Sequence, residues 1–340
     1  MSQSSVLQDC KKVVRHRSLV YLVQPEYLFN YFFVGTESSD SKRVVVVGGA
    51  GFIGSHVTDA LVERDLDVHV IDNLSNGKRE NVNADAHLHV VDIRDLSAIG
   101  PIIEGARALF HFAALPRVPF SIEHPLESHN VNVNGTLNVL VAARDGNVGR
   151  VVYSASSSAY GDPPMLPATE DMQPNPKSPY GLQKLIGEQY CRVFSEVYGL
   201  PTVALRYFNV YGSRFNAEGA YALVIGKFLK QRLEGNPMTI TGDGEQTRDF
   251  TNVRDVVRAN LLAMDSDKVG KGEVINIGPG KNYSINQIAQ LIGGPVEYVP
   301  ARLEPRNSLA DNRKAKELLG WSPEVTIEEG IAELRKRFGL

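Results

Sequence analysis

An apolar run that passes into clustered glycines, VVVVGGAGFIGSHV, begins at Val44 and limits the possible folds of this chain more than any other stretch. Four β-branched residues in a row indicate a buried strand, and a helix-forming stretch follows the glycines. Such glycines permit a tight turn and a close backbone approach to a diphosphate, which the free N–H groups of the helix N-terminus would bind. The stretch therefore predicts a dinucleotide-binding turn lined by Gly48, Gly51, Phe52, Ile53 and Gly54.

The segments that follow repeat this alternation of apolar strand and helix. Strands are expected in DVHVID, HLHVVD, ALFHFAA, RVVYSAS and TVALRYFNV, most of them separated by helical stretches. Strands that are apolar on both faces and alternate with helices are typical of a parallel sheet covered on both sides. We therefore expect an α/β protein with a Rossmann-type doubly wound parallel sheet and a smaller C-terminal α/β substrate lobe.

The alternation breaks after Asn209, and this break suggests the domain limits. Residues 43–212 are expected to form the cofactor-binding domain, completed by about 249–277. Residues 213–248 and 278–340 would form the substrate lobe above the carboxyl ends of the strands, where ligands of open α/β sheets bind.

Charge and cysteine content narrow the class of protein. The net charge of -3 argues against nucleic acid or an anionic membrane as partner, since either would require a clustered basic face. Cys10 and Cys191 stand far apart and form no metal-ligand pattern, which favours reduced thiols in a cytoplasmic protein and no metal. Residues 1–42 are expected to be an extension, packed on the surface or poorly ordered, with neither a membrane span nor a signal peptide.

An acidic residue, Asp72, closes the second predicted strand in VIDNLSNGK, with Asn73 beside it. A carboxylate at this place can accept hydrogen bonds from both ribose hydroxyls of the adenosine and would repel a 2′-phosphate, so NAD is favoured over NADP. Asp92 and Ile93 end the third strand, where the adenine should lie. A helix cap is the alternative interpretation of DIRD.

Tyr180 and Lys184 in PYGLQK lie four residues apart near the start of a predicted helix and therefore share one face. A free tyrosine has a pKa of about 10, which a nearby ammonium and a positive nicotinamide ring would both lower. Tyrosine could then take a proton from a sugar hydroxyl while hydride leaves the same carbon for NAD+. Tyr-x-x-x-Lys alone also occurs on surface helices, but downstream of a dinucleotide turn it indicates catalysis.

Together these motifs resemble the extended short-chain dehydrogenase/reductase family, and within it the nucleotide-sugar 4-epimerases, especially those of UDP-glucose and UDP-N-acetylglucosamine. The resemblance covers about residues 43–340 and rests on GGAGFIG, DNLS, HFAAL, NVNGT, SSSAYGD, PYGLQK, LRYFNVYG, TRDF and LAD..KA..LGW.P. It implies NAD as cofactor, a UDP-sugar as substrate, and a homodimer held by a four-helix bundle from about 125–144 and 178–198.

The resemblance also gives the serine cluster in SSSAYGD a role. Ser156, four residues before Tyr160, matches the family's catalytic hydroxyl, which would bind the sugar 4-oxygen beside Tyr180. Ser157 and Ser158 stand where the related 4,6-dehydratases have Asp and Glu. This implies redox chemistry at C4 without the groups that eliminate water.

Other positions match the family's site one by one. On the nicotinamide side these are Ala113, Ala114, Leu115, Asn132 and Tyr207. Around the substrate diphosphate they are Asn209, Arg248 and Arg302, with Arg306 near the same group. Ser308, two residues before Ala310, matches a position where a small residue admits a 2-acetamido group and a bulky aromatic residue excludes it.

Two residues depart from this pattern, because Arg117 and Phe120 stand where acetamido-sugar epimerases usually have Ser and Arg. The sequence predicts an NAD-dependent isomerase that epimerises C4 of UDP-glucose, and of UDP-N-acetylglucosamine, through a 4-keto intermediate. One alternative is a UDP-uronate 4-epimerase or decarboxylase, with Arg117 as the cation for the carboxylate. The other is a dinucleotide-binding protein without catalysis.

Overall fold

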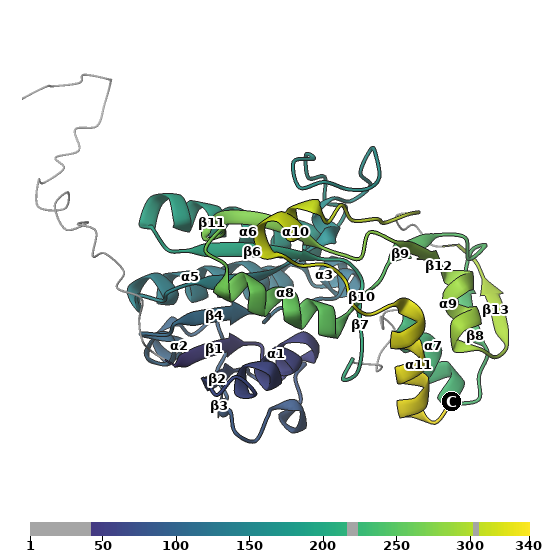
Figure 1. Ribbon diagram of the computed structural model, residues 1–340, viewed down its shortest axis with the longest axis horizontal. Helices are drawn as coiled ribbons and strands as arrows, with labels where there is room; N and C mark the ends of the chain where they lie inside the picture. The colour runs from purple at the N-terminus through teal and green to yellow at the C-terminus, as the bar shows by residue number, and fades with distance from the viewer. Residues whose placement is uncertain (1–41, 216–223, 302–305) are drawn as a thin grey trace, which may run out of the picture. The chain divides into compact units, whose positions relative to one another are not determined.

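Seven parallel strands form the central sheet, in the order β11-β6-β5-β4-β1-β2-β3 (Figure 1). The structure is a computed structural model that describes residues 42–215, 224–301 and 306–340. The strand order confirms the predicted doubly wound parallel sheet. The strands are β1 (Arg43–Val47), β2 (Asp67–Ile71), β3 (His87–His89), β4 (Ala108–His111), β5 (Val151–Ser156), β6 (Thr202–Tyr207) and β11 (Lys271–Ile277).

Helices cover both faces of this sheet. Along β1, Val44 and Val46 belong to one hydrophobic cluster and Val45 and Val47 to another, because successive side chains of a strand point to opposite faces. The first cluster includes α1 (Phe52–Val62), α8 (Val253–Asp265) and α10 (Arg313–Leu319); the second includes α2 (Leu96–Ile103), α5 (Thr136–Asp145) and α6 (Pro179–Tyr198).

Short helical segments precede the helices of the second face. The 3-10 turns η2 (Arg79–Asn81) and η4 (Ser157–Ala159) follow β2 and β5. The segments α3 (Val118–Glu123), α4 (Pro125–His129) and the π-helical turn η3 (Asn130–Gly135) lead into α5, so residues 125–145 are helical almost as predicted.

Many of the elements after β6 build a second hydrophobic core. It includes residues such as Phe228, Ile240, Ile288 and Ile331, from two-stranded sheets and the helices between them. The elements are β7 (Val210–Tyr211) with β10 (Thr251–Asn252), β8 (Met238–Thr241) with β13 (Val296–Val299), β9 (Thr247–Asp249) with β12 (Asn282–Ser284), and α7 (Val224–Leu233), α9 (Ile285–Ile292) and α11 (Ile327–Phe338).

The proposed domain limits stay a prediction, and two observations bear on them. β11 joins the central sheet beside β6, as expected for the segment 249–277. The extension 1–42 lies almost wholly outside the described residues, as does Arg302. Among the residues that are described, no helix has the length and apolarity to cross a bilayer.

Candidate active site

A cavity of about 1300 Å³ lies where β1, β2, β4, β5 and β6 end. It is lined by residues of the loops that follow these strands, by residues of the second core such as Phe250 and Ile285, and by Arg248 and Ser308. All the predicted site residues line it except Asn132, Arg306 and the undescribed Arg302. The carboxyl edge of the sheet therefore brings together side chains that lie far apart in the sequence.

Glycines shape one end of this cavity. Gly48 has a φ of +85°, and a Cβ there would lie 2.5 Å from the backbone nitrogen of Ala113. A Cβ on Gly54 would lie 2.3 Å from the oxygen of Gly48. Helix α1 begins after Gly51 without a side-chain cap, which leaves its first N–H groups available to an anion. This cradle fits the diphosphate of a dinucleotide, because only glycine leaves the backbone accessible there.

Asp72 stands next to that turn with its carboxylate held by backbone groups. Its Oδ2 accepts a hydrogen bond from the nitrogen of Ala50 at 3.0 Å, and its Oδ1 accepts one from the nitrogen of Leu74 at 2.8 Å. Burial raises the pKa of Asp72, and these two N–H groups oppose the rise. Each oxygen keeps a second acceptor position, so the carboxylate can still receive the two ribose hydroxyls.

A hydrogen bond joins the loops after β2 and β3 at the end of the cavity where the adenine is expected. Asn73 donates a hydrogen bond from Nδ2 to Oδ2 of Asp92 at 2.9 Å. The side chain of Arg94 binds the same carboxylate and holds the pKa of Asp92 well below its usual range. The cap of α2 is Asp95, whose Oδ1 accepts from the nitrogen of Ala98 at 3.1 Å. The helix-cap interpretation of DIRD therefore applies to Asp95, while Asp92 lines the cavity.

Helix α6 presents Tyr180 and Lys184 to the cavity from its first turns. Ser178 caps the helix by accepting a hydrogen bond from the nitrogen of Gly181 at 3.1 Å, and Pro179 occupies the first helical position. The hydroxyl of Ser121 accepts a hydrogen bond from the nitrogen of Tyr180, also at 3.1 Å. Ser121 and Ser178 were missed as positioning residues, although the Ser-Pro pair before PYGLQK is a recognisable helix start.

Lys184 is buried among polar groups of three elements. Its Nζ donates a hydrogen bond of 2.7 Å to the oxygen of Ser154 and lies 5.0 Å from the centre of the Tyr153 ring. Burial lowers the pKa of Lys184 to about 8, and the negative charge of Glu188 opposes this shift. Glu188 in turn forms two hydrogen bonds with Arg206, at 2.8 and 2.7 Å, in a pair that is almost fully buried.

The lowered pKa expected for Tyr180 is not found in the protein without its cofactor. Burial raises the pKa of Tyr180 to about 12, while a hydrogen bond with Ser156 acts in the opposite direction. Burial destabilises the phenolate of Tyr180 by more than the hydrogen bond with Ser156 stabilises it. A positive charge brought into the cavity by a ligand would favour the phenolate.

Ser156, at the end of β5, has both hydroxyl acceptor positions occupied by Ser158. It accepts from the nitrogen of Ser158 at 3.2 Å and from its hydroxyl at 2.8 Å. A serine hydroxyl has one proton and two acceptor positions, so the proton of Ser156 remains as a donor. The serine cluster thus directs one hydroxyl hydrogen into the cavity near Tyr180.

The substrate end of the cavity is formed by Asn209, Arg248 and Ser308. The hydroxyl of Ser308 accepts hydrogen bonds from Nδ2 of Asn209 and from the nitrogen of Asp249, both at 3.2 Å. Arg248 donates from Nη1 to the oxygens of Thr247 and of residue 306. These contacts anchor the side chains expected to meet a diphosphate.

Asn132 and Arg306, two predicted residues, and Phe120, one of the two departures from the family pattern, do not line the cavity. Asn132 is buried behind the cavity wall, where it binds both the nitrogen and the oxygen of Leu115 and the side chain of Gln183. Arg306 pairs with Asp243 at 2.9 Å. Arg117 lines the cavity, whereas Phe120 packs against His124 with ring centres 4.7 Å apart.

The position of Asn132 behind the wall has a local structural reason. The π-helical turn over 130–135 alters which side chains face the sheet, and a single sequence gives no sign of such a turn. Its place in the wall makes Asn132 a support of the Leu115 backbone. Gln183, whose Nε2 donates to Ser128 at 2.8 Å, completes this buried network and was also missed.

Comparison with known proteins agrees with this geometry. The family described as "NAD dependent epimerase/dehydratase family" matches residues 44–278. The chain belongs to this NAD-dependent family. Both the resemblance drawn from the motifs and the cofactor prediction are thereby confirmed.

Relatives within the epimerase/dehydratase family match nearly the whole described chain. A putative UDP-glucose 4-epimerase of Methanocaldococcus jannaschii is 40% identical over 85% of this chain and 95% of its own length. The crystal structure of UDP-glucose 4-epimerase from Thermotoga maritima, with UDP-glucose, is 40% identical with a TM-score of 0.82, and the match covers 87% and 99% of the two chains.

Other relatives differ in activity. UDP-N-acetylglucosamine 4-epimerase from Methanobrevibacter ruminantium, in complex with UDP-N-acetylmuramic acid, is 38% identical with a TM-score of 0.83 over 88% of this chain and 98% of its own. UDP-glucuronic acid decarboxylase 1 of Xenopus tropicalis is 32% identical over 86% of this chain and 71% of its own length. The family is therefore established. Which nucleotide sugar this chain accepts depends on the residues that line its cavity.

Proposed function

We propose that this member of the family is an NAD-dependent 4-epimerase of UDP-hexoses that acts on UDP-glucose and UDP-N-acetylglucosamine. The observation that carries the proposal is the shared cavity of the dinucleotide turn with Ser156, Tyr180 and Lys184. Serine at positions 157 and 158 offers no acid or base of suitable pKa for elimination of water. A binding protein without catalysis would have no need of this combination.

The residues of the chain divide the chemistry between them. Bound NAD would supply the oxidant for C4 of the sugar and, in its reduced form, the reductant for the return of the hydride. Tyr180 accepts the proton of the 4-hydroxyl and gives it back when the 4-keto sugar has rotated. Ser156 donates a hydrogen bond to the 4-oxygen, and Lys184 holds the helix against β5 and adds positive charge near Tyr180.

The substrate end supports recognition of a UDP-sugar with room for its rotation. Arg248 supplies a fixed cation for the diphosphate, and Asn209 is held beside it. Ser308 is small and contributes little volume to the wall near the sugar. We infer that it leaves space for a 2-acetamido group in both orientations of the keto sugar.

A UDP-uronate enzyme is the second candidate, because Arg117 lines the cavity and decarboxylases occur among the relatives. An arginine beside the sugar could bind a C6 carboxylate in a bidentate manner. In that case UDP-glucuronate, and not UDP-glucose, would be the substrate.

One experiment separates these candidates. The purified chain is incubated with UDP-glucose, UDP-N-acetylglucosamine or UDP-glucuronate, and the products are identified by NMR. C4 epimers of the first two support the proposal. Epimer or pentose product from UDP-glucuronate alone supports the uronate enzyme, and absence of product from all three would leave only a binding role.

We also propose that the chain forms a homodimer through α6 and the helical segment 125–145. Large apolar side chains are exposed on these helices, with exposed fractions of 87% for Leu126 and 64% for Val197. Leu182 and Val193 on α6 are exposed as well. Apolar side chains gathered on packed helices favour association. A monomer mass in light scattering at micromolar concentration would contradict the dimer.

The cytoplasmic location of the protein stays a prediction.

A further inference from the structure

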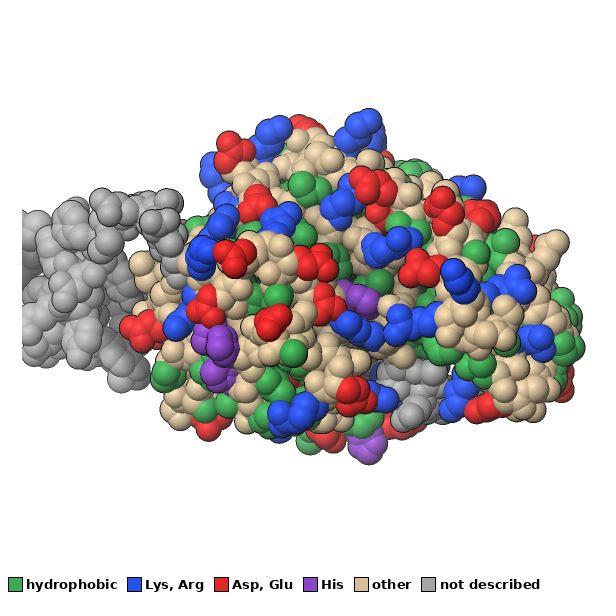
Figure 2. All heavy atoms as spheres, turned by 60° about the horizontal axis from the view of Figure 1, so that its bottom comes forward, with side chains coloured by type: hydrophobic (Ala, Val, Ile, Leu, Met, Phe, Trp, Pro, Cys, Tyr) green, Lys and Arg blue, Asp and Glu red, His purple; other side chains and the backbone are tan. Residues whose placement is uncertain are grey.

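A group of imidazoles and one carboxylate lies at the edge of the central sheet, on β2 and β3, outside the cavity. Asp67 and His69 are two residues apart on β2 and therefore share a face. His69 is the register partner of His87 in the parallel pair, and His89 lies two residues further along β3. Strand pairing thus gathers four potential metal ligands from two segments, and histidine side chains are visible on this part of the surface in Figure 2.

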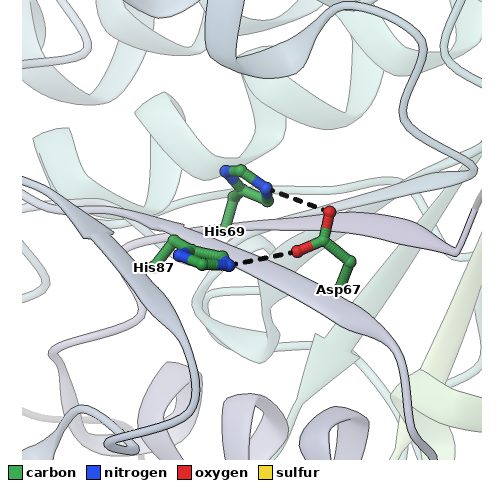
Figure 3. Close-up of side chains that lie close together, drawn as sticks. All are labelled: Asp67, His69 and His87. Carbon is green, nitrogen blue, oxygen red and sulfur yellow. Dashed lines mark hydrogen bonds and ion pairs between the residues drawn. The ribbon is translucent and has the colours of Figure 1, made fainter.

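The donor atoms of three residues converge. Figure 3 shows the rings of His69 and His87 directed at the two oxygens of Asp67, and each Nε2 lies 3.3 Å from its oxygen. The three donor atoms all lie within 4.8 Å of one another. A tetrahedral ion with bonds of about 2.0–2.1 Å holds its donors about 3.3–3.4 Å apart. Each imidazole nitrogen already has this separation from one oxygen of Asp67, His69 from Oδ2 and His87 from Oδ1. A small rotation of the carboxylate and the rings would therefore bring one oxygen and both nitrogens to three corners of a tetrahedron.

His89 can act as the supporting partner that metal-bound imidazoles usually have. Its Nε2 lies 2.9 Å from Nδ1 of His69. When His69 donates from Nδ1 to His89, its Nε2 carries a lone pair that faces the carboxylate of Asp67, and a cation between them relieves the repulsion. In the other tautomer His69 donates a proton from Nε2 to Asp67, which is the metal-free arrangement.

We propose that Asp67, His69 and His87 bind a divalent transition-metal cation, and that Zn²⁺ satisfies this donor set. Two imidazoles and a carboxylate suit zinc, and water can complete the coordination because the side chains of Asp67 and His87 are 42% and 62% exposed. The positive charge of Arg43, whose Nε lies 3.9 Å from Oδ2 of Asp67, opposes binding and limits the affinity.

The role of this site is structural and not catalytic. Asp67 begins the strand that ends before Asp72, and five residues of strand span about 16 Å, which places the cluster far from the cofactor turn. β3 is an edge strand of three residues with a single neighbour, so a metal shared by β2 and β3 would fasten it to the sheet. The loops that carry Asp72 and Asp92 follow these two strands.

The test is calorimetric titration of the untagged full chain with Zn²⁺, after treatment with a chelator that is then removed. We expect a site whose affinity falls about tenfold or more in His87→Ala and in Asp67→Asn. Both side chains are exposed, so the variants should keep the fold, which circular dichroism checks. His129→Ala, on exposed helix α4, is the matched control and should bind zinc like the unmodified chain.

A spectroscopic titration with Co²⁺ gives a second measurement. Co²⁺ bound by these ligands and water should show the visible absorption of a tetrahedral site. His87→Ala should abolish this absorption. The proposal is overturned if zinc does not bind at about 1 mM, or if His87→Ala and Asp67→Asn bind it like the unmodified chain. Neither result depends on the epimerase activity.

Discussion

The ammonium nitrogen of Lys184 lies 2.7 Å from the backbone oxygen of Ser154, two residues before Ser156 on the same strand. This bond joins the catalytic face of α6 to the end of β5. The distance between the hydroxyls of Tyr180 and Ser156 therefore depends on strand–helix contact and not on the loop between them. The predictions that follow test the site built around this junction.

Replacement of Tyr180 by Phe should reduce kcat about 100-fold or more, because the group that accepts the 4-hydroxyl proton is lost. NAD content, measured after denaturation of the purified variant, should not change. Tyr198→Phe, at the exposed end of the same helix, is the control. A variant that keeps a tenth of the activity, a barrier change of only about 1.4 kcal/mol, would exclude Tyr180 as the proton acceptor.

Ser156→Ala should lower kcat less than Tyr180→Phe does, because the phenolate can still take the proton. The variant also loses the acceptor for the nitrogen of Ser158, so a stability loss of about 0.5–2 kcal/mol is expected. Steady-state kinetics and urea unfolding measure the two effects separately. Activity equal to that of the unmodified enzyme would remove Ser156 from the mechanism.

Asp72→Ser should narrow the preference for NAD over NADP, because the charge that repels a 2′-phosphate is removed. Serine keeps an acceptor for the nitrogens of Ala50 and Leu74, although only one oxygen replaces two. Dissociation constants of both cofactors, from fluorescence titration of the cofactor-free protein, provide the measurement. Equal affinities in the unmodified protein would contradict the role of Asp72.

Ser308→Tyr should abolish epimerisation of UDP-N-acetylglucosamine and spare that of UDP-glucose. The larger tyrosine side chain would occupy the space that the 2-acetamido group needs. NMR of both reactions gives the ratio of the two activities. If the unmodified enzyme ignores UDP-N-acetylglucosamine, Ser308 is not sufficient and Arg117 becomes the residue to vary. If the variant loses both activities, the hydrogen bonds from Asn209 and Asp249 to Ser308 matter more than its volume.

Asp249 should make stability depend on pH between about 4 and 7. Burial raises the pKa of Asp249 from 3.8 to about 7, although the nitrogens of Ala310 and Gly280 donate to its carboxylate and oppose the rise. The folded state therefore holds a proton that the unfolded state releases, and the resulting stabilisation is complete below the unfolded pKa and lost as pH rises through 7.

The comparison variant is Asp249→Asn, which has the same shape and no charge to titrate. The free energy of unfolding of the unmodified chain, relative to this variant, should fall as pH rises from 4 to 7. Urea unfolding of both proteins at several pH values measures the difference. A constant difference across this range would show that Asp249 does not titrate there.

The sequence predicted best those parts of the site that depend on local structure. Gly48 and Asp72 lie at the ends of strands whose apolar runs are unmistakable, and the turn between strand and helix follows directly from them. Tyr180 and Lys184 lie on one helix, where spacing alone decides that they share a face. The doubly wound parallel sheet also followed, because alternating strands and helices allow few arrangements.

The rest of the site depends on packing between distant segments. Asn132, in a π-helical turn, donates a hydrogen bond to Gln183 on α6, and Ser121 reaches the nitrogen of Tyr180 across 59 residues of sequence. His69 and His87 meet because β2 and β3 pair in one particular register, and a shift by one residue would separate them. No periodicity within either segment contains that information.

The buried pair of Glu188 and Arg206, which joins α6 to β6, limits how sequences of this kind can diverge. Loss of either partner alone leaves an uncompensated buried charge and costs about 3–5 kcal/mol, a large part of the stability of most proteins. Replacement of both by apolar residues can be neutral. Homologues of this chain should therefore keep both residues or replace both. A homologue with only one of them should carry a nearby substitution that compensates the buried charge.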